Sequence, residues 1–183
     1  MAPCPNGRRT MTSSSLIPLA KALGREAGHQ LQVSHGRRSA LLLPLLALVG
    51  PLAFAAAPTR AEVWKGPTCG CCHDWIAHLE ANGFSARAHD DGNDEARRRL
   101  GMPIRYGSCH TALIDGYAIE GHVPAREIKR LLAERPRAVG LAVPAMPIGS
   151  PGMDGPAYRG RRDPFDVLLV ARDGQATVYQ SYR

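Results

Sequence analysis

Three cysteines fall within four consecutive positions, in the stretch "KGPTCGCCHDW" that covers residues 65–75. Cys69 and Cys72 have the Cys-x-x-Cys spacing of a dithiol that exchanges with disulfides, and Cys71 places a further thiol inside this frame. Clustered thiolates are also good ligands for soft metal ions. The stretch therefore indicates one of two chemistries, thiol–disulfide exchange or soft-metal binding.

A purely structural role for the cysteines fits their spacing less well. A fourth cysteine, Cys109, follows later in the chain and directly precedes His110. Four cysteines in a small secreted domain commonly form two disulfides. The first three, however, would close loops of only a few residues, and such loops stabilise a fold little through chain entropy. We expect these sulfurs to serve chemistry.

The start of the sequence predicts a leader with a signal peptide over residues 1–57. Arg37 and Arg38 precede the apolar run "SALLLPLLALVGPLAFAAA", and small residues follow, so the exit is expected between residues 55 and 61. The paired arginines are compatible with twin-arginine export. A membrane anchor is less favoured because two prolines and a glycine interrupt the run. We expect a periplasmic protein with no membrane span after cleavage.

The net charge of +7 belongs to the leader. Residues 1–61 carry seven Lys/Arg against one acidic residue, whereas residues 62–183 carry sixteen against fifteen. No basic stripe is interleaved with aromatic residues, so nucleic-acid binding is not expected. Residues 62–183 are enough for one domain with its own core.

The elements that would carry the cysteines follow an α/β order. The patterns predict a strand at 62–65, a helix from Cys72, a strand at 84–90, a short helix before Pro103, a hairpin around Asp115-Gly116, a helix over 124–136 and a final hairpin around Asp173-Gly174. A long Pro/Gly-rich loop, residues 140–164, precedes the final hairpin. The clustered cysteines would lie where the first strand turns into the first helix, and a helix N-terminus favours thiolate.

This order resembles the thioredoxin-like superfamily over residues 62 to about 135. In that superfamily a Cys-x-x-Cys turn follows the first strand and a Pro-Thr pair opens the strand that faces it; His110-Thr111 holds that place here. The resemblance implies a thioredoxin-like α/β sandwich, extended by a C-terminal β-hairpin and the long Pro/Gly-rich loop. It also implies that Cys109 faces the clustered cysteines, and that replacing the proline removes an obstacle to metal binding and offers His110 as a ligand.

Four shorter stretches resemble a more specific family. They are "PTCGCCHDW" (67–75), "SCHTA" (108–112), "GHVP" (121–124) and "MPIGSPGM" (146–153), in that order. Together they are similar to the DUF411-type family of small exported bacterial metal-binding proteins, which is associated with copper resistance. The resemblance implies a single metal-binding domain over residues 62–183, with copper ions and other periplasmic copper-handling proteins as its partners.

The expected ligands are four thiolates, one imidazole and two thioethers: Cys69, Cys71, Cys72, Cys109, His110, Met146 and Met153. Such soft donors select Cu(I), zinc or iron–sulfur clusters. Structural zinc sites usually combine two Cys-x2–4-Cys pairs, and a zinc site here would leave Cys71 without a role. Cu(I) accepts few ligands and bridging sulfurs, so we favour copper as Cu(I) over zinc. His122, within "GHVP", is left outside this ligand set, with two readings open: a functional role, or a hydrogen bond in the strand-to-helix turn.

Two functions follow from these residues. The favoured one is a non-enzymatic periplasmic protein that binds Cu(I) in copper handling or resistance. The alternative is a thioredoxin-like thiol–disulfide oxidoreductase that uses Cys69 and Cys72, with Cys71 or Cys109 as the resolving thiol. The two can merge, since a site that binds Cu(I) when reduced and forms a disulfide as it reduces Cu(II) couples thiol and copper redox chemistry.

Overall fold

The computed structural model describes residues 57–183, so the leader predicted over residues 1–57 lies, except for its last residue, outside the described part. The elements in chain order are β1 (Thr59–Lys65), α1 (Gly70–Ala81), β2 (Phe84–His89), α2 (Asp94–Arg99), η1 (Ile104–Tyr106), β3 (His110–Ile114), β4 (Tyr117–Glu120), α3 (Ala125–Glu134), β5 (Ala138–Ala142), η2 (Pro156–Tyr158), β6 (Phe165–Ala171) and β7 (Ala176–Tyr182). The predicted α/β class and the order of elements through α3 are confirmed.

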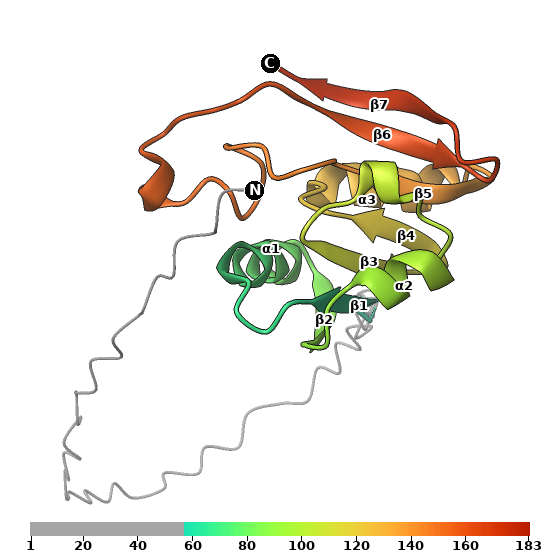
Figure 1. Cartoon of the computed structure of the whole chain (residues 1–183), viewed down its shortest axis with the longest axis horizontal. Helices are drawn as coiled ribbons and strands as arrows, with labels where there is room; N and C mark the ends of the chain where they lie inside the picture. Colours follow the sequence, from blue (N-terminus) through green and yellow to red (C-terminus); the bar gives the residue numbers. More distant parts are fainter. Residues whose placement is uncertain (1–56) are drawn as a thin grey trace, which may run out of the picture. The chain divides into compact units, whose positions relative to one another are not determined.

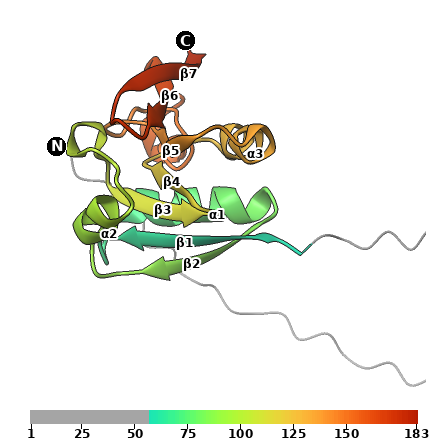
Figure 2. The same cartoon turned by 90° about the vertical axis from the view of Figure 1, so that its right-hand side faces the viewer.

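The seven strands form one sheet in the order β2-β1-β3-β4-β5-β6-β7. Both views of the molecule show the strands stacked in this order (Figures 1 and 2). β1 is parallel to β2 and antiparallel to β3, with Lys65 at the end of β1 opposite His110 at the start of β3. The cysteine turn follows β1 and Cys109 precedes β3. Antiparallel pairing therefore brings both cysteine-bearing segments to the same end of the sheet.

Helix α1 is held by apolar residues spaced three and four positions apart. Cys72, Trp75 and Leu79 are all fully buried on one side of the helix. The indole Nε1 of Trp75 also donates a hydrogen bond of 2.9 Å to the carbonyl oxygen of Val123, at the turn between β4 and α3. The core thus fixes the first turn of α1, and with it the cysteines.

Strand β5 differs from the sequence-based expectation, which placed its second half in the Pro/Gly-rich loop. β5 pairs in parallel with β4 and antiparallel with β6, so the predicted C-terminal hairpin (β6 and β7) joins the main sheet. β5 is a short apolar run, buried over its last three residues, and it lacks the alternation that marks a half-exposed strand, which explains the difference. The thioredoxin-like type of this fold stays a prediction. Within the described residues, no helix has the length and apolar character needed to cross a membrane.

Candidate metal centre

The first segment of the site is the turn between β1 and α1. Cys69 is the N-cap of α1, and its backbone N–H donates to the carbonyl oxygen of Gly66 at 3.2 Å. Cys71 and Cys72 lie in the first helical turn and are buried. That first turn contains no acidic residue, and the positive end of the helix dipole there favours negative charge on the sulfurs.

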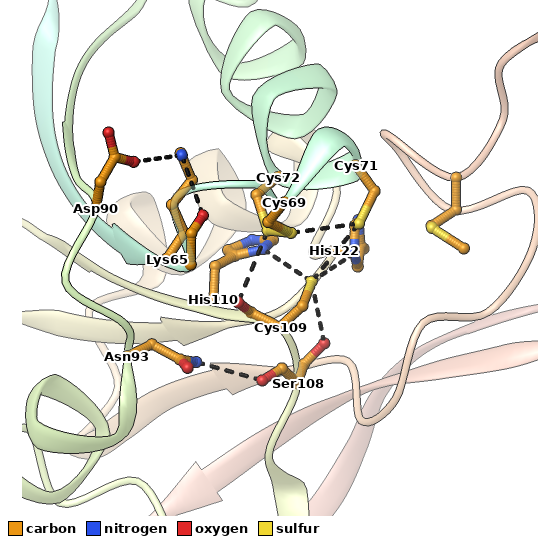
Figure 3. The surroundings of a disulfide bond; sticks show 12 residues. Lys65, Cys69, Cys71, Cys72, Asp90, Asn93, Ser108, Cys109, His110 and His122 are labelled. Carbon is orange, nitrogen blue, oxygen red and sulfur yellow. Dashed lines mark hydrogen bonds and ion pairs between the residues drawn. A yellow bond between two sulfur atoms is a disulfide. The ribbon is translucent and has the colours of Figure 1, made fainter. Parts of the chain in front are cut away.

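The second segment brings Cys109 to this turn. The Sγ atom of Cys71 lies 3.6 Å from that of Cys69 and 3.9 Å from that of Cys109. The Sγ atom of Cys72 lies 3.7 Å from the carbonyl oxygen of Cys109. The four sulfurs are all within 4.8 Å of one another (Figure 3). The structure therefore brings together the four cysteines that the sequence proposed as ligands.

The structure holds the Cys-x-x-Cys frame in its oxidised form. A disulfide joins Cys69 to Cys72, whose Cα atoms are 5.4 Å apart, whereas Cys109 carries a free thiol. Thiolate, rather than disulfide sulfur, is the strong ligand for a soft metal. Cys69 and Cys72 thus require a two-electron reduction before they can contribute fully to a metal site.

Two imidazoles lie against the thiol of Cys109. The Nε2 atom of His122 lies 3.1 Å and the Nδ1 atom of His110 lies 3.4 Å from the Sγ atom of Cys109. These three residues form a second group with metal-ligand spacing, which shares Cys109 with the first. Of the two roles left open for His122, this position beside Cys109 favours a functional one.

A sequence signal for His122 was present in the hairpin. The turn at Asp115-Gly116 pairs Ile114 with Tyr117 and Thr111 with Glu120. Continuing this register by two residues places His122 opposite Cys109. The register of a two-residue hairpin follows from its turn, so the approach of the two side chains could have been read from the sequence.

Hydrogen bonding and packing fix the two rings differently. The Nδ1 atom of His122 is 2.8 Å from the carbonyl oxygen of Pro151 and donates to it, which leaves Nε2 with its lone pair toward Cys109. The ring of His110 packs on Trp75 with centroids 4.3 Å apart. Among the described residues, Nε2 of His110 is one of two buried side-chain polar atoms without a hydrogen-bond partner. Such an unsatisfied atom is costly and calls for a functional explanation.

Burial keeps Cys109, His110 and His122 uncharged. It raises the pKa of the Cys109 thiol to about 11 and lowers the pKa values of His110 and His122. Near neutral pH, Cys109 is therefore a neutral thiol beside two neutral imidazoles. A bound cation would favour the thiolate by its own charge, so metal binding at Cys109 would release a proton.

Both predicted methionines lie at the sulfur cluster. Met153 is buried with Cys71 and Cys72, and Met146 packs against the same group. The hydroxyl of Tyr158 donates to the Sδ atom of Met153 at 3.2 Å. Gly152, with φ +83°, brings the loop so close to α1 that a Cβ atom there would lie 2.6 Å from the carbonyl oxygen of Cys71. The loop thus covers the first turn of α1 and supplies thioether sulfur beside the thiols.

Comparison with known proteins agrees with this combination of residues. The sequence model of a family described as "Protein of unknown function, DUF411" matches residues 106–153, which include Cys109, both imidazoles and the two methionines. Two solved structures, copper resistance protein CopG in form 2 and in form 1, are each 48% identical in sequence with a TM-score of 0.63. They cover 69% and 68% of this chain, and the chain covers 99% and 98% of theirs. No curated protein matches the sequence.

The matched segment and the two structures define the class of this molecule. It is a mixed α/β protein with a cysteine cluster suited to metal binding. The chain belongs to the DUF411 copper-resistance family.

Proposed function

We propose that this protein binds copper, in the form of Cu(I), through thiolates of Cys69, Cys71, Cys72 and Cys109, and that it acts in copper handling or resistance. The observation that carries the proposal is the convergence of four sulfurs from two separate segments within 4.8 Å. The two solved relatives, both named as copper resistance proteins, support copper as the metal.

The donor set favours Cu(I) over zinc. Four sulfurs within 4.8 Å of one another allow some to bridge two Cu(I) ions, whereas a structural zinc site uses each ligand once in a closed tetrahedron. The neighbouring Met146 and Met153 add thioethers, which are soft and bind Cu(I) well. His122 adds a neutral imidazole whose Nε2 atom is free to coordinate, and we include it in the site with His110.

The surrounding residues determine when the site can bind. Reduction of the Cys69–Cys72 disulfide supplies two of the thiols, and the cation displaces the proton of Cys109. Met146 and Met153 pack against the sulfurs, of which those of Cys71 and Cys72 are buried and those of Cys69 and Cys109 are partly buried. The protein itself therefore contributes clustered soft ligands, a low-polarity cover and two nearby imidazoles.

A second candidate function, copper-coupled thiol redox chemistry, is favoured by the disulfide itself. The thiols of Cys69 and Cys72 would each release one proton. Together they would transfer two electrons, one to each of two Cu(II) ions. The products would be one disulfide, two Cu(I) ions and two protons. Cys109, together with the imidazoles of His110 and His122, would then hold the Cu(I) that forms. A thiol–disulfide oxidoreductase acting on proteins would use the same two cysteines without copper.

We propose the periplasm as the location and other periplasmic copper-handling proteins as partners. The leader predicted over residues 1–57 supports this location. β1 begins at Thr59, so a signal-peptide exit before that residue would leave the strand intact.

One anaerobic experiment tests these functions together. Reduced protein is titrated with Cu(I) against a competing chelator, and the Cys109→Ser variant is expected to lose more than about tenfold in affinity, or about 1.4 kcal/mol. Separately, Cu(II) is added to the reduced protein and free thiols are counted. Loss of two thiols per two Cu(I) formed supports the coupled redox function. Unchanged Cu(I) affinity in Cys109→Ser contradicts the proposed site.

A further inference from the structure

A buried ion pair lies beside the segment that carries Cys109 and takes no part in the sulfur cluster. Arg97 of α2 is 4% exposed and Glu120 of β4 is fully buried. The Nη2 and Nε atoms of Arg97 lie 2.9 and 3.0 Å from the same carboxylate oxygen, Oε1 of Glu120. A buried ion pair often stabilises a fold no more than apolar residues of similar size would. Its hydrogen bonds point to another use.

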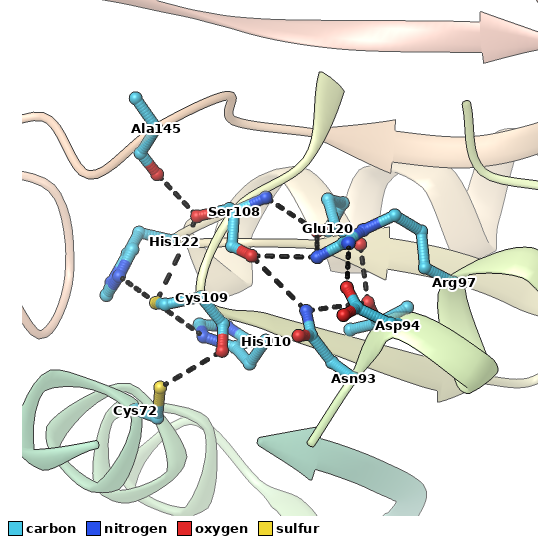
Figure 4. A network of polar contacts seen from close by, with 11 residues as sticks. Cys72, Asn93, Asp94, Arg97, Ser108, Cys109, His110, Glu120, His122 and Ala145 are labelled. Carbon is cyan, nitrogen blue, oxygen red and sulfur yellow. Dashed lines mark hydrogen bonds and ion pairs between the residues drawn. The ribbon is translucent and has the colours of Figure 1, made fainter. Parts of the chain in front are cut away.

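The pair holds the peptide groups of Ser108, the residue before Cys109. Oε1 of Glu120 accepts a hydrogen bond of 2.7 Å from the backbone N–H of Ser108. Nη2 of Arg97 donates to the carbonyl oxygen of Ser108 at 2.8 Å, and Nδ2 of Asn93 donates to the same oxygen at 3.2 Å. Figure 4 shows these bonds converging on Ser108 while the side chain of Cys109 points toward the metal centre. Both backbone polar groups of Ser108 are therefore fixed by charged or amide side chains.

The same carboxylate also holds the chain beyond Cys109. Oε2 of Glu120 accepts a hydrogen bond of 2.6 Å from the hydroxyl of Thr111, whose Oγ1 atom accepts one of 3.2 Å from Asn93. Glu120 thus binds residues on both sides of Cys109 and His110. A displacement of this segment would have to break bonds at both of its ends.

Ser108 is also closely packed on the side away from the ion pair. A Cβ atom at Gly121, where φ is +69°, would lie 2.5 Å from Oγ of Ser108. The hydroxyl of Ser108 in turn donates to the carbonyl oxygen of Ala145, in the loop that covers the sulfurs. Ser108 is held between the ion pair and this loop.

We propose that Arg97, Glu120 and Asn93 are positioning residues that hold the Cys109 thiol at the metal centre. This role rests on the proposed function, because it assigns to these residues the task of presenting one thiolate to Cu(I). Ligands that are held in place before the metal arrives bind it more tightly, and their supporting partners commonly account for about 10- to 100-fold in affinity. The hydrogen bonds that hold Ser108 come from Arg97, Glu120 and Asn93, so we expect the network to act on the Cys109 side of the site.

A double-mutant cycle separates positioning from general stability. Glu120→Gln is expected to lower the Cu(I) affinity of the full protein about tenfold while Cys109 is present. In a Cys109→Ser background the same change is expected to alter affinity by less than about twofold, because the residue being positioned is gone. A purely structural role would instead give equal losses in both backgrounds, and that result would overturn the proposal.

Two further variants and one metal-free readout complete the test. Glu127→Gln is the matched control, since Glu127 is also a buried carboxylate and lies on α3 outside the network; its Cu(I) affinity should equal that of wild type. Asn93→Ala removes only the hydrogen bonds of the side-chain amide and replaces Glu120→Gln as the test variant if that protein does not fold. Its Cu(I) affinity is expected to fall about threefold, because the hydrogen bonds it loses are uncharged and weaker. Amide hydrogen exchange at Ser108 in the metal-free protein should speed up in Glu120→Gln and Asn93→Ala but not in Glu127→Gln.

The outcomes distinguish this role from the function on which it rests. Wild-type protein that binds Cu(I) while Glu120→Gln and Asn93→Ala bind it equally well would overturn the positioning role alone. Reduced wild-type protein that fails to compete with the chelator for Cu(I) would overturn the proposed function, and the positioning role with it.

Discussion

The two segments that form the metal centre are held in place by different interactions. The cysteine turn of α1 is fixed by apolar packing, in which Trp75 and Leu79 are buried in the main core. The segment with Cys109 is fixed by a buried charged network around Ser108. One half of the site is therefore anchored by non-directional burial and the other by directional hydrogen bonds.

This difference matches the chemistry proposed for each half. The turn of α1 carries three sulfurs, two of which form a disulfide in this structure, so this half must tolerate the change between thiol and disulfide. The burial of Trp75 and Leu79 that holds α1 in the main core involves neither of these two sulfurs. Cys109 supplies a single sulfur, flanked by two imidazoles at 3.1 and 3.4 Å, and directional bonds suit a ligand that has one required position.

The largest effect is expected in the packed half, the half of the site that the cysteine turn of α1 carries. Trp75→Ala removes a fully buried indole and its hydrogen bond to the carbonyl oxygen of Val123, and should lower the free energy of unfolding by about 3–5 kcal/mol. Urea denaturation followed by circular dichroism measures this loss. Trp64→Ala is the control, because Trp64 is only partly buried and packs on His89 away from the cysteines. Equal losses in the two variants would contradict the special role of Trp75.

How far the sequence predicted the site depended on the range of the interactions involved. The cysteine turn was predicted well because a strand, a turn and the spacing of Cys72, Trp75 and Leu79 are local features. The approach of Cys109 came only from the resemblance to known families, since it depends on the pairing of β1 with β3. His122 was left outside the expected ligand set although the hairpin register places it opposite Cys109, because strand register was not extended past the last paired residues.

The ion pair could not have been predicted from the sequence in the same way. Arg97 lies in a run of three arginines in which neither Arg98 nor Arg99 is buried. Which arginine points inward depends on how α2 packs against β3, and no local pattern specifies that packing. The predicted hairpin places Glu120 opposite Thr111, but this register alone does not show which arginine the carboxylate meets.

A smaller effect is expected in the loop that covers both halves. Met153→Leu keeps a similar volume but replaces a thioether beside Cys71 and Cys72, so the loss of stability should stay below about 1.5 kcal/mol. If the thioether binds copper, Cu(I) affinity should fall about threefold or more, equivalent to roughly 0.7 kcal/mol. Competition with a chelator and urea denaturation measure the two quantities separately.

Met102→Leu is the matched control for this change. Met102 is also buried, but in a separate cluster with Ala118, Ala142 and Val170. Its replacement should cost similar stability without any change in Cu(I) affinity. Identical affinities for wild type, Met153→Leu and Met102→Leu would assign Met153 to packing alone and would remove it from the metal centre.

The smallest effect concerns His78, which ties the packed half to α3. Its Nε2 atom accepts a hydrogen bond of 3.1 Å from the backbone N–H of Ala125, so the ring must stay neutral at that nitrogen. Burial is the main cause that lowers the pKa of His78 in the folded protein. The unfolded chain, with a histidine pKa of about 6.5, binds the proton more readily. Stability is therefore expected to be full above this pH and to fall as the pH drops below it.

A comparison of wild type with His78→Asn across pH 7.5 to 5 isolates this contribution. His110 and His122, whose pKa values are lowered too, are present in both proteins and cancel in the difference. Wild type should be more stable by about 1 kcal/mol at the upper end, the value of one hydrogen bond, and the advantage should shrink toward pH 5. A difference that stays constant over this range would show that the bond to Ala125 does not titrate. The packed half would then depend on apolar burial and on the hydrogen bond from Trp75 to Val123.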